Sequence, residues 1–396
     1  MELEKLYENA GNLTSKGLDN IIYDEYCFID EDTDEYTEEY LKNEYNFKSF
    51  SDGLTECINK YGFKGDINSV EEKTEYIISK CKENNVQLNP AIIKTWFKDK
   101  RPVSEKRSRE NVYKLCFALK LDLKQTSDFF YNTYFECPFN FRIHNEAIYF
   151  YCLNRGLDYS KAQELIEKAD KIITSNISDN NESEYEFTYH IGNEIFQINS
   201  EEKLLEYIKK HSNEFLISNK TAYNHAKRLI DECTELAVKL YNNDITYRDE
   251  RKFTNKKKNI DLLLFVMFDT DMLIKNNKNN SFSKTSQFPE LIKSNFPLKM
   301  QLSNICNNKK VSYDTMRKAL IILNFFCFFA SACIKDEEGD FLQFVAETDD
   351  LLESCGYPKL YVRNPYDWLI MHCANHYTPL VELANSIKRY YIYANE

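Results

Sequence analysis

The chain has 396 residues, 43% of them hydrophobic and 29% charged, and a formal net charge of −12. This length allows two or three domains with real cores, and the composition excludes a disordered protein. Such an acidic chain is not coated with nucleic acid over its whole surface, although one local basic face stays compatible with it. Only nine glycines and eight prolines occur. Such scarce turn signals favour a mostly all-α protein with short polar loops.

The first predicted region, residues 1–53, contains an acidic segment. Nine residues from Asp24 to Glu39 are Asp or Glu, and no Lys or Arg occurs between Lys16 and Lys42. This pattern is typical of a solvated helix or a flexible arm, and an alternative is that it covers a basic face. The opening residues have neither a basic start nor an apolar run. A cytoplasmic location without a secretory signal is therefore expected.

The second region, residues 54–177, is predicted to be a helical domain with a basic turn. Asn89 and Pro90 predict the cap and first position of a short helix that ends at Lys100-Arg101-Pro102. A longer helix follows, and its apolar face from Val112 to Leu119 is expected to pack on Trp96. In this arrangement Trp96 is buried and Arg101 is exposed in the turn.

The stretch "NPAIIKTWFKDKRPVSEKRSRENVYKLCFALKLDLKQTSDFF" resembles the last three helices of a lambda-repressor-like (Xre-type) helix-turn-helix domain. It departs from that family at Asp99, where Gly is usual. The resemblance implies a double-stranded DNA partner, with most contacts to phosphates and few to base edges. The base-edge candidates are Asn89, Lys94 and Thr95, and the phosphate candidates are Lys98, Lys100, Arg101, Arg107 and Arg109.

A second stretch, "ICNNKKVSYDTMRKALIILNFF", repeats this pattern later in the chain. Val103, Ser104 and Arg109 align without a gap on Val311, Ser312 and Arg317, and removal of Pro102 aligns Lys100 and Arg101 with Lys309 and Lys310. The windows Lys94 to Lys114 and Lys293 to Lys318 each carry a net charge of +5. We therefore predict a pseudo-symmetric repeat that adds Lys309, Lys310 and Arg317 to the DNA-binding candidates. Chance similarity of two amphipathic helices, with a solvated basic face, is the alternative.

The remaining regions are a central helical region with a basic loop, residues 178–280, and a C-terminal helical domain with the repeat, residues 281–396. The apolar tract from Ala319 to Ile334 has 16 residues. A membrane span needs about 20 residues, so a buried core helix and no membrane partner are predicted. Asn364-Pro365 predicts a further capped helix.

Motifs for catalysis are not found, and neither an enzyme nor a cofactor is predicted. The sequence has no Gly-rich phosphate loop, GxSxG elbow or HExxH motif. Its twelve cysteines include no Cys-x-x-Cys pair and are expected to be reduced thiols. His372 and His376 are weak metal candidates, because no second ligand pair with matching spacing accompanies them.

These patterns favour a sequence-specific DNA-binding transcriptional regulator. Its expected setting is a mobile element or a defence locus. A protein partner or a homo-oligomer is compatible with the second helical lobe. One alternative is a non-enzymatic interaction module that keeps the helical unit without DNA binding. Another is a toxin-type or antiphage effector.

Overall fold

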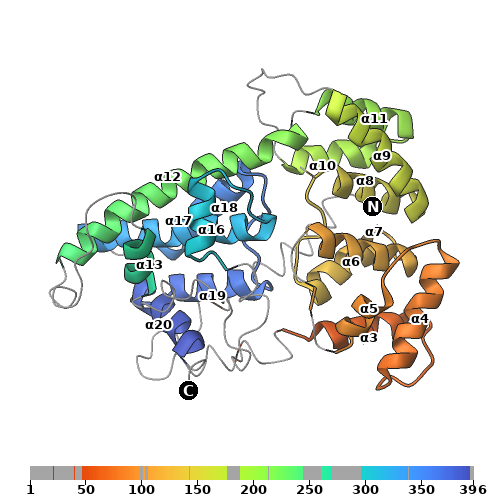
Figure 1. Ribbon diagram of the computed structural model, residues 1–396, viewed down its shortest axis with the longest axis horizontal. Coiled ribbons are helices and arrows are strands. Elements are labelled where there is room, and N and C mark those ends of the chain that lie inside the picture. Colours follow the sequence, from red (N-terminus) through yellow and green to blue (C-terminus); the bar gives the residue numbers. More distant parts are fainter. Residues whose placement is uncertain are drawn as a thin grey trace. The chain divides into compact units, whose positions relative to one another are not determined.

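The computed structural model describes residues 47–98, 101–102, 106–141, 143–175, 188–212, 214–243, 260–268, 296–337 and 339–392, together with Ile21 and Tyr40 (Figure 1). Every regular element in these ranges is a helix, which confirms the predicted all-α class. The chain forms two compact units, and the boundary between them falls within helix α12, after Asn219. Unit 1 holds the described residues from Lys48 to Asn219. Unit 2 holds those from Lys220 onward with Phe47, Tyr40 and Ile21.

Unit 1 contains the ten helical elements from α3 to α11 and, in addition, the first residues of α12 (Glu214–Asn243). They are α3 (Phe50–Lys60), α4 (Val70–Glu83), α5 (Pro90–Trp96), α6 (Lys106–Ala118), α7 (Leu123–Phe129), the π-helix η2 (Phe130–Tyr134), α8 (His144–Arg155), α9 (Tyr159–Ser175), α10 (Thr188–Gln197) and α11 (Glu201–Lys210).

The core of unit 1 is organised around α8. All residues of α8 from Glu146 to Leu153 are buried, and α7, α9 and α10 contact it. A helix that is enclosed by neighbours needs no polar stripe, which explains the almost continuous apolar run in this segment. Gly156 ends α8 with φ 65, so the left-handed conformation that a glycine tolerates closes the helix.

Unit 2 contains most of α12 and six further helices of the described chain. They are α13 (Ile260–Phe268), α16 (Lys299–Cys306), α17 (Tyr313–Lys335), α18 (Phe341–Ser354), α19 (Pro365–Ala374) and α20 (Pro379–Ile392).

The core of unit 2 is built on α17 and α19. Every residue of α19 is buried, and α17 contacts α18, α19 and α20. By length and composition α17 is the one helix in the described ranges that could cross a membrane, and core helices pass the same test. Its residues Leu320, Phe325 and Ala330 belong to the hydrophobic core of this unit. The prediction of a buried core helix for this tract is therefore confirmed.

Two predicted helix starts are confirmed in detail. The side chain of Asn89 accepts a hydrogen bond from the Ala91 amide, with Pro90 as the first residue of α5. In the same way Asn364 caps α19 ahead of Pro365. An Asn cap satisfies amide groups that have no partner within the helix, and proline fits the first turn because it has no amide hydrogen to satisfy.

Candidate nucleic-acid interface

The short helix α5 is fixed by its buried side. Trp96 is 2% exposed, and its ring lies edge-on to Phe50, with 5.7 Å between the ring centroids. Ile93 is fully buried, and both residues belong to one hydrophobic cluster with Val112 of α6. The expectation that Trp96 is buried is therefore confirmed, and the ring that it meets is Phe50 of α3.

The other side of α5 is polar and exposed. Asn89, Thr95 and Lys98 are exposed, and the Thr95 hydroxyl donates to the carbonyl oxygen of Ile92 at 2.7 Å. Asn89 uses its side-chain oxygen for the helix cap. Thr95 on α5 and the flanking residues Asn89 and Lys98 are therefore the groups here that a partner can reach.

A turn from Asn84 to Asn89 joins α4 to α5, and the two helices are in contact. Asn85 adopts φ 53, a left-handed conformation that asparagine tolerates better than most residues. Val86 directly after it is buried. The turn is therefore anchored from inside and fixes where α5 lies on α4.

Lys94 has a carboxylate partner on the neighbouring helix. Its Nζ lies 2.8 Å from Oε1 of Glu71 in α4, and this hydrogen bond is the main reason why the pKa of Glu71 is lowered. Both side chains are largely exposed, so the pair contributes little to stability. It does reduce the positive charge that Lys94 offers to a phosphate.

Arg101 is enclosed, which corrects the expectation of an exposed turn residue. Its Nη1 donates to the carbonyl oxygen of Thr133 at 2.5 Å, and its Nη2 donates to that of Lys48 at 2.6 Å. The guanidinium also lies 4.5 Å from the ring centre of Phe135. Burial lowers the pKa of Arg101 to about 10, so its surroundings disfavour the charge. Arg101 therefore ties three segments of unit 1 together and is a poor phosphate contact.

We expect the substitution Arg101→Ala to destabilise unit 1 by about 2–4 kcal/mol, because two partly buried carbonyl groups lose a charged donor. Chemical denaturation monitored by circular dichroism measures this loss. Arg107→Ala is the matched control, since Arg107 is exposed and should change stability by no more than about 0.5 kcal/mol. Equal stability of the two variants would contradict the anchoring role of Arg101.

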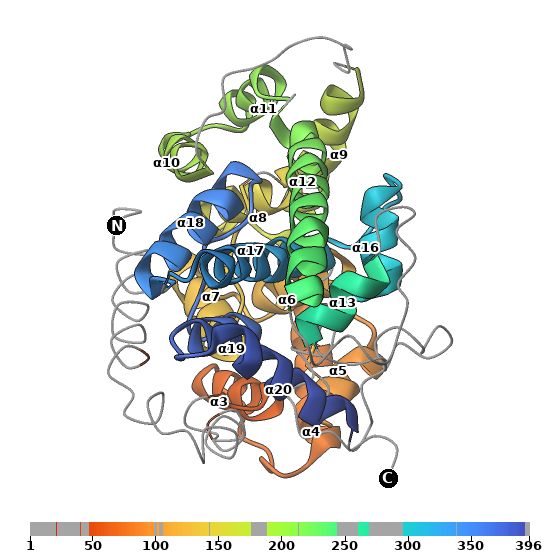
Figure 2. The same ribbon diagram turned by 90° about the vertical axis from the view of Figure 1, so that its left-hand side faces the viewer.

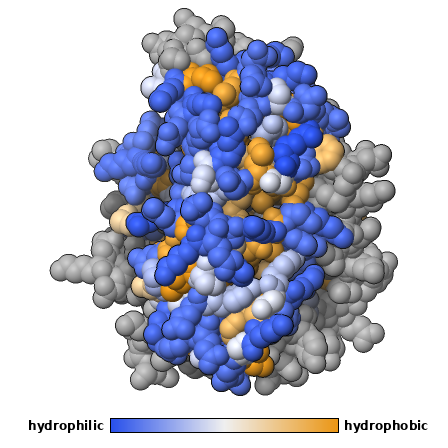
Figure 3. Space-filling view, turned by 90° about the vertical axis from the view of Figure 1, so that its right-hand side faces the viewer, coloured by the Kyte–Doolittle hydropathy of each residue, from blue (hydrophilic) through white to orange (hydrophobic). Residues whose placement is uncertain are grey.

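Lys98 directly follows the C-cap of α5 and is exposed, and so is Arg107 at the start of α6. Thr95, Arg107 and Asn111 line a recess of about 260 Å³ between α5 and the start of α6. Lys100, another predicted contact, lies outside the described residues. In the view of Figure 3, hydrophilic residues predominate and hydrophobic ones appear in separate patches.

Arg109 points into the core of unit 1. Its Nε and Nη2 lie 2.8 and 2.7 Å from the two carboxylate oxygens of Glu146 in α8, and Nη2 also donates to the carbonyl oxygen of Cys137 at 3.0 Å. Glu146 further accepts from the Tyr113 hydroxyl and from the Asn140 amide, each at 2.9 Å. The guanidinium is not available to a phosphate, which corrects the prediction made for Arg109.

Arg317 has the same role in unit 2. Its Nη1 and Nη2 each lie 2.7 Å from one carboxylate oxygen of Asp367 in α19. Its Nε donates to the carbonyl oxygen of Pro358 at 3.3 Å, and Asp367 accepts from the Tyr361 amide at 2.9 Å. Arg317 is 7% exposed and Asp367 is fully buried. The predicted DNA contact at Arg317 is therefore corrected as well.

The two buried pairs correspond residue by residue, although different guanidinium nitrogens make the bonds. In each unit the carboxylate accepts from the backbone amide six residues before it, Asn140 in unit 1 and Tyr361 in unit 2. In each unit the arginine donates to a backbone carbonyl of the same loop, Cys137 or Pro358, which precedes its carboxylate by an equal stretch of chain. The alignment of Arg109 with Arg317 thus coincides with a shared three-dimensional arrangement.

The correspondence extends to the helices between these partners. Asp122 caps α7 by accepting from the Gln125 amide, and Asp340 caps α18 by accepting from the Gln343 amide. Glu146 and Asp367 were not identified from the sequence as the partners of the two arginines. The signal that could have found them is that Glu146 precedes Cys152 in α8 by the same number of residues as Asp367 precedes Cys373 in α19.

Comparisons with protein-family models, with curated proteins and with solved structures found no match for this chain. The resemblance to Xre-type domains stays a prediction from the residues of α5 and α6.

Unit 2 has a turn between α16 and α17, which the alignment of the two basic stretches matches to the turn between α5 and α6. Lys309 and Lys310 are exposed there. The hydroxyl of Tyr223 in α12 donates to the carbonyl oxygen of Lys309 at 2.7 Å and accepts from the Val311 amide at 3.0 Å. The backbone of this turn is thus fixed while both lysine side chains lie at the surface.

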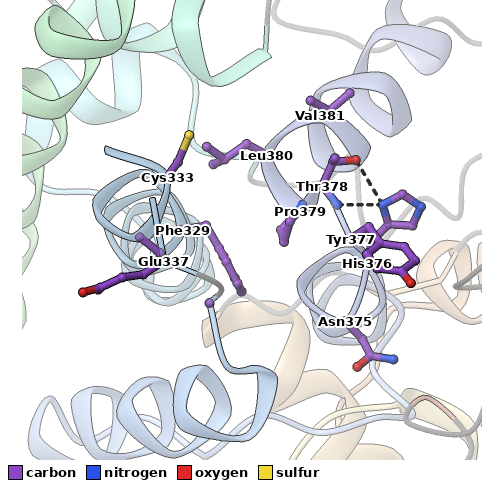
Figure 4. A pocket seen from close by; sticks show the side chains of 12 residues that line it. Phe329, Cys333, Glu337, Asn375, His376, Tyr377, Thr378, Pro379, Leu380 and Val381 are labelled. Carbon is purple, nitrogen blue, oxygen red and sulfur yellow. Dashed lines mark hydrogen bonds between the residues drawn. The ribbon is translucent and has the colours of Figure 1, made fainter. Parts of the chain in front are cut away.

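His372 and His376, the two weak metal candidates, lie in different environments. His372 is fully buried and stacks on Trp368, with 4.9 Å between the ring centroids. His376 lines an apolar recess of about 410 Å³ at α17 and α20, where Nδ1 accepts from the Thr378 amide at 3.2 Å (Figure 4). Within the described ranges no group of three or more His, Cys, Asp or Glu side chains could hold a metal ion.

Proposed function

We propose that the chain is a non-enzymatic DNA-binding regulator in which α5 of unit 1 meets the DNA. The observation that carries this proposal is the exposure of Thr95 in α5 and of Asn89 and Lys98 at its two ends, with Arg107 in the same recess as Thr95. A helix that enters the major groove reads bases with a few side chains near its N-terminus, and cations around it hold the phosphates.

The contact between α4 and α5 supports this proposal. In a helix-turn-helix motif the first helix lies across the second and a short turn joins them. Here the turn from Asn84 to Asn89 is longer than the usual three or four residues. The buried Val86 and the left-handed Asn85 nevertheless give it a defined path.

Fewer side chains are available for DNA contacts than the sequence predicted. Arg101 and Arg109 are bound inside unit 1, and Lys94 is paired with Glu71. Lys98 and Arg107 are then the phosphate contacts in unit 1, and Lys309 and Lys310 at the equivalent turn are those in unit 2. With so few contacts and a net charge of −12, binding should be weak and should fall with rising salt.

We expect the double variant Lys98→Ala with Arg107→Ala to bind duplex DNA more weakly and with a lower salt dependence. Each phosphate contact contributes about 0.9 to the slope of log K against log salt, so the slope should fall by about 1.8. Fluorescence anisotropy with a mixed-sequence duplex at several salt concentrations measures it.

Lys171→Ala is the matched control, because Lys171 is an exposed cation of α9, away from α5 in the chain. It should leave affinity and slope unchanged. If the double variant keeps the parental slope, or if the parent binds no DNA, the regulator proposal is wrong.

A protein-interaction module without DNA binding is the second candidate. The ion pair between Lys94 and Glu71 favours it, because a carboxylate next to a recognition helix repels the phosphate backbone. Under this alternative the double variant changes no DNA-binding property, since the parent has none.

A further inference from the structure

Helix α12 crosses α17 in unit 2 (Figure 2), and these helices carry Cys233 and Cys327 respectively. Cys233 of α12 is fully buried, and its Sγ donates to the carbonyl oxygen of Leu323 at 3.2 Å. Leu323 lies one helical turn before Cys327 in α17. The thiol of Cys233 therefore lies against the turn of α17 that ends at Cys327.

Small side chains of α12 lie in the core that it shares with α17. Ala226, Cys233 and Ala237 of α12 are all fully buried and belong to one hydrophobic cluster with Leu323. The distance between two packed helices depends on the side chains at the contact, and short ones let the backbones approach. A close approach is also what a disulfide needs, since its two Cα atoms must lie within about 7 Å.

The two thiols differ in accessibility. Cys327 is partly exposed, and its Sγ lies 3.7 Å from Oε2 of Glu232, the residue next to Cys233 in α12. The neighbouring Cys233 thiol lowers the pKa of Cys327 in spite of burial and of Glu232, whereas burial raises the pKa of Cys233 well above its usual value. Redox-active pairs commonly combine an accessible thiol of lowered pKa with a neighbouring resolving thiol.

We propose that Cys233 and Cys327 form a reversible disulfide within unit 2, in which Cys327 is the attacking thiol and Cys233 the resolving thiol. The proposal of this modification site does not rest on the proposed DNA binding. Neither cysteine is bonded in the structure, where every cysteine in the described ranges is a free thiol.

The oxidant is a low-molecular-weight disulfide such as oxidised glutathione. The Cys327 thiolate attacks one of its sulfurs, so that a bond from Cys327 to one glutathione forms and the other glutathione leaves as a thiolate. Cys233 then gives its proton to solvent and attacks Sγ of Cys327, and the second glutathione leaves. Two cysteine thiols are oxidised, and one glutathione disulfide is reduced to two thiols.

The disulfide would fix α12 at its crossing with α17. The same helix contacts the turn between α16 and α17, where the Tyr223 hydroxyl bonds to Lys309 and Val311 and the Lys227 ammonium donates to the Asn308 side chain. Oxidation at Cys233 therefore restrains the helix that holds the exposed Lys309 and Lys310.

The test is to incubate the full chain with oxidised glutathione, block remaining thiols with N-ethylmaleimide and analyse an unreduced digest by mass spectrometry. We expect a peptide linked through Cys233 and Cys327 that dithiothreitol removes. Cys333→Ser, which changes an exposed cysteine of the same helix, should give this link at the parental rate. Cys327→Ser should abolish it.

Cys233→Ala separates the resolving role from a structural one. Alanine suits a buried position in this stripe, and circular dichroism should show an unchanged fold. This variant should accumulate glutathione on Cys327, whereas the parent should retain none. The proposal is overturned if the parent also keeps the glutathione adduct, if links to Cys333 or between two chains dominate, or if no link forms.

Discussion

Replacement of Arg317 by methionine should lower the free energy of unfolding of unit 2 by about 3–5 kcal/mol, because Asp367 is left as a buried carboxylate without its charged partner. Asp367 is fully buried, and both of its oxygens are bound by the guanidinium at 2.7 Å. The Tyr361 amide remains as a donor but carries no net charge. The effect is therefore large for a single substitution.

Urea denaturation followed by tryptophan fluorescence measures this loss within unit 2. The chain has two tryptophans, Trp96 in unit 1 and Trp368 in unit 2, so a Trp96→Phe background reports on Trp368 alone. The matched control is the double variant Arg317→Met with Asp367→Asn, which removes both charges and should recover a substantial part of the stability. If Arg317→Met unfolds within about 0.5 kcal/mol of the parent, the pair does not hold the unit.

Local features of the fold could be predicted from the sequence because their causes are local. Asn89-Pro90 and Asn364-Pro365 define helix starts through hydrogen bonds to amides two or three residues away. The left-handed Gly156 needs only its own backbone to end α8. Trp96 was placed in the core by the spacing of apolar residues around it.

The roles of the arginines could not be predicted in the same way. The basic sequence around Arg109 looks the same whether its guanidinium meets phosphate or carboxylate. Its partner Glu146 is 37 residues away, and Asp367 is 50 residues from Arg317. Only the packing of α6 on the segment before α8, and of α17 on that before α19, brings these groups together.

The alignment of the two basic stretches pairs Arg109 with Arg317, and both are buried in the described part of their unit. The charge surrounding these residues predicts a DNA-binding face, whereas their guanidinium groups meet carboxylates. A buried arginine tolerates little change in its partners, because its hydrogen bonds must all be made. The similarity of the stretches is thus explained by the core of each unit, whereas Lys98 and Arg107 remain the exposed cations that the regulator proposal needs.

Trp96→Ala is expected to lower the free energy of unfolding of unit 1 by about 3–5 kcal/mol, because it leaves a cavity that rigid neighbours cannot fill. Trp96 meets the Phe50 ring, and Phe50 in turn lies edge-on to Phe129 and Tyr134, with centroid distances of 5.9 and 6.2 Å. Loss of the indole thus weakens the attachment of α5 and should abolish DNA binding together with stability.

The remaining tryptophan makes this effect measurable in one molecule. In Trp96→Ala the fluorescence comes from Trp368 of unit 2, whose transition should keep its parental midpoint if the units unfold separately, while circular dichroism shows earlier loss of helix. Trp96→Phe keeps an aromatic ring against Phe50 and should lose clearly less stability than the alanine variant. A change below about 1 kcal/mol in Trp96→Ala would mean that α5 is held by other contacts, because truncation of a buried tryptophan ordinarily costs several times that amount.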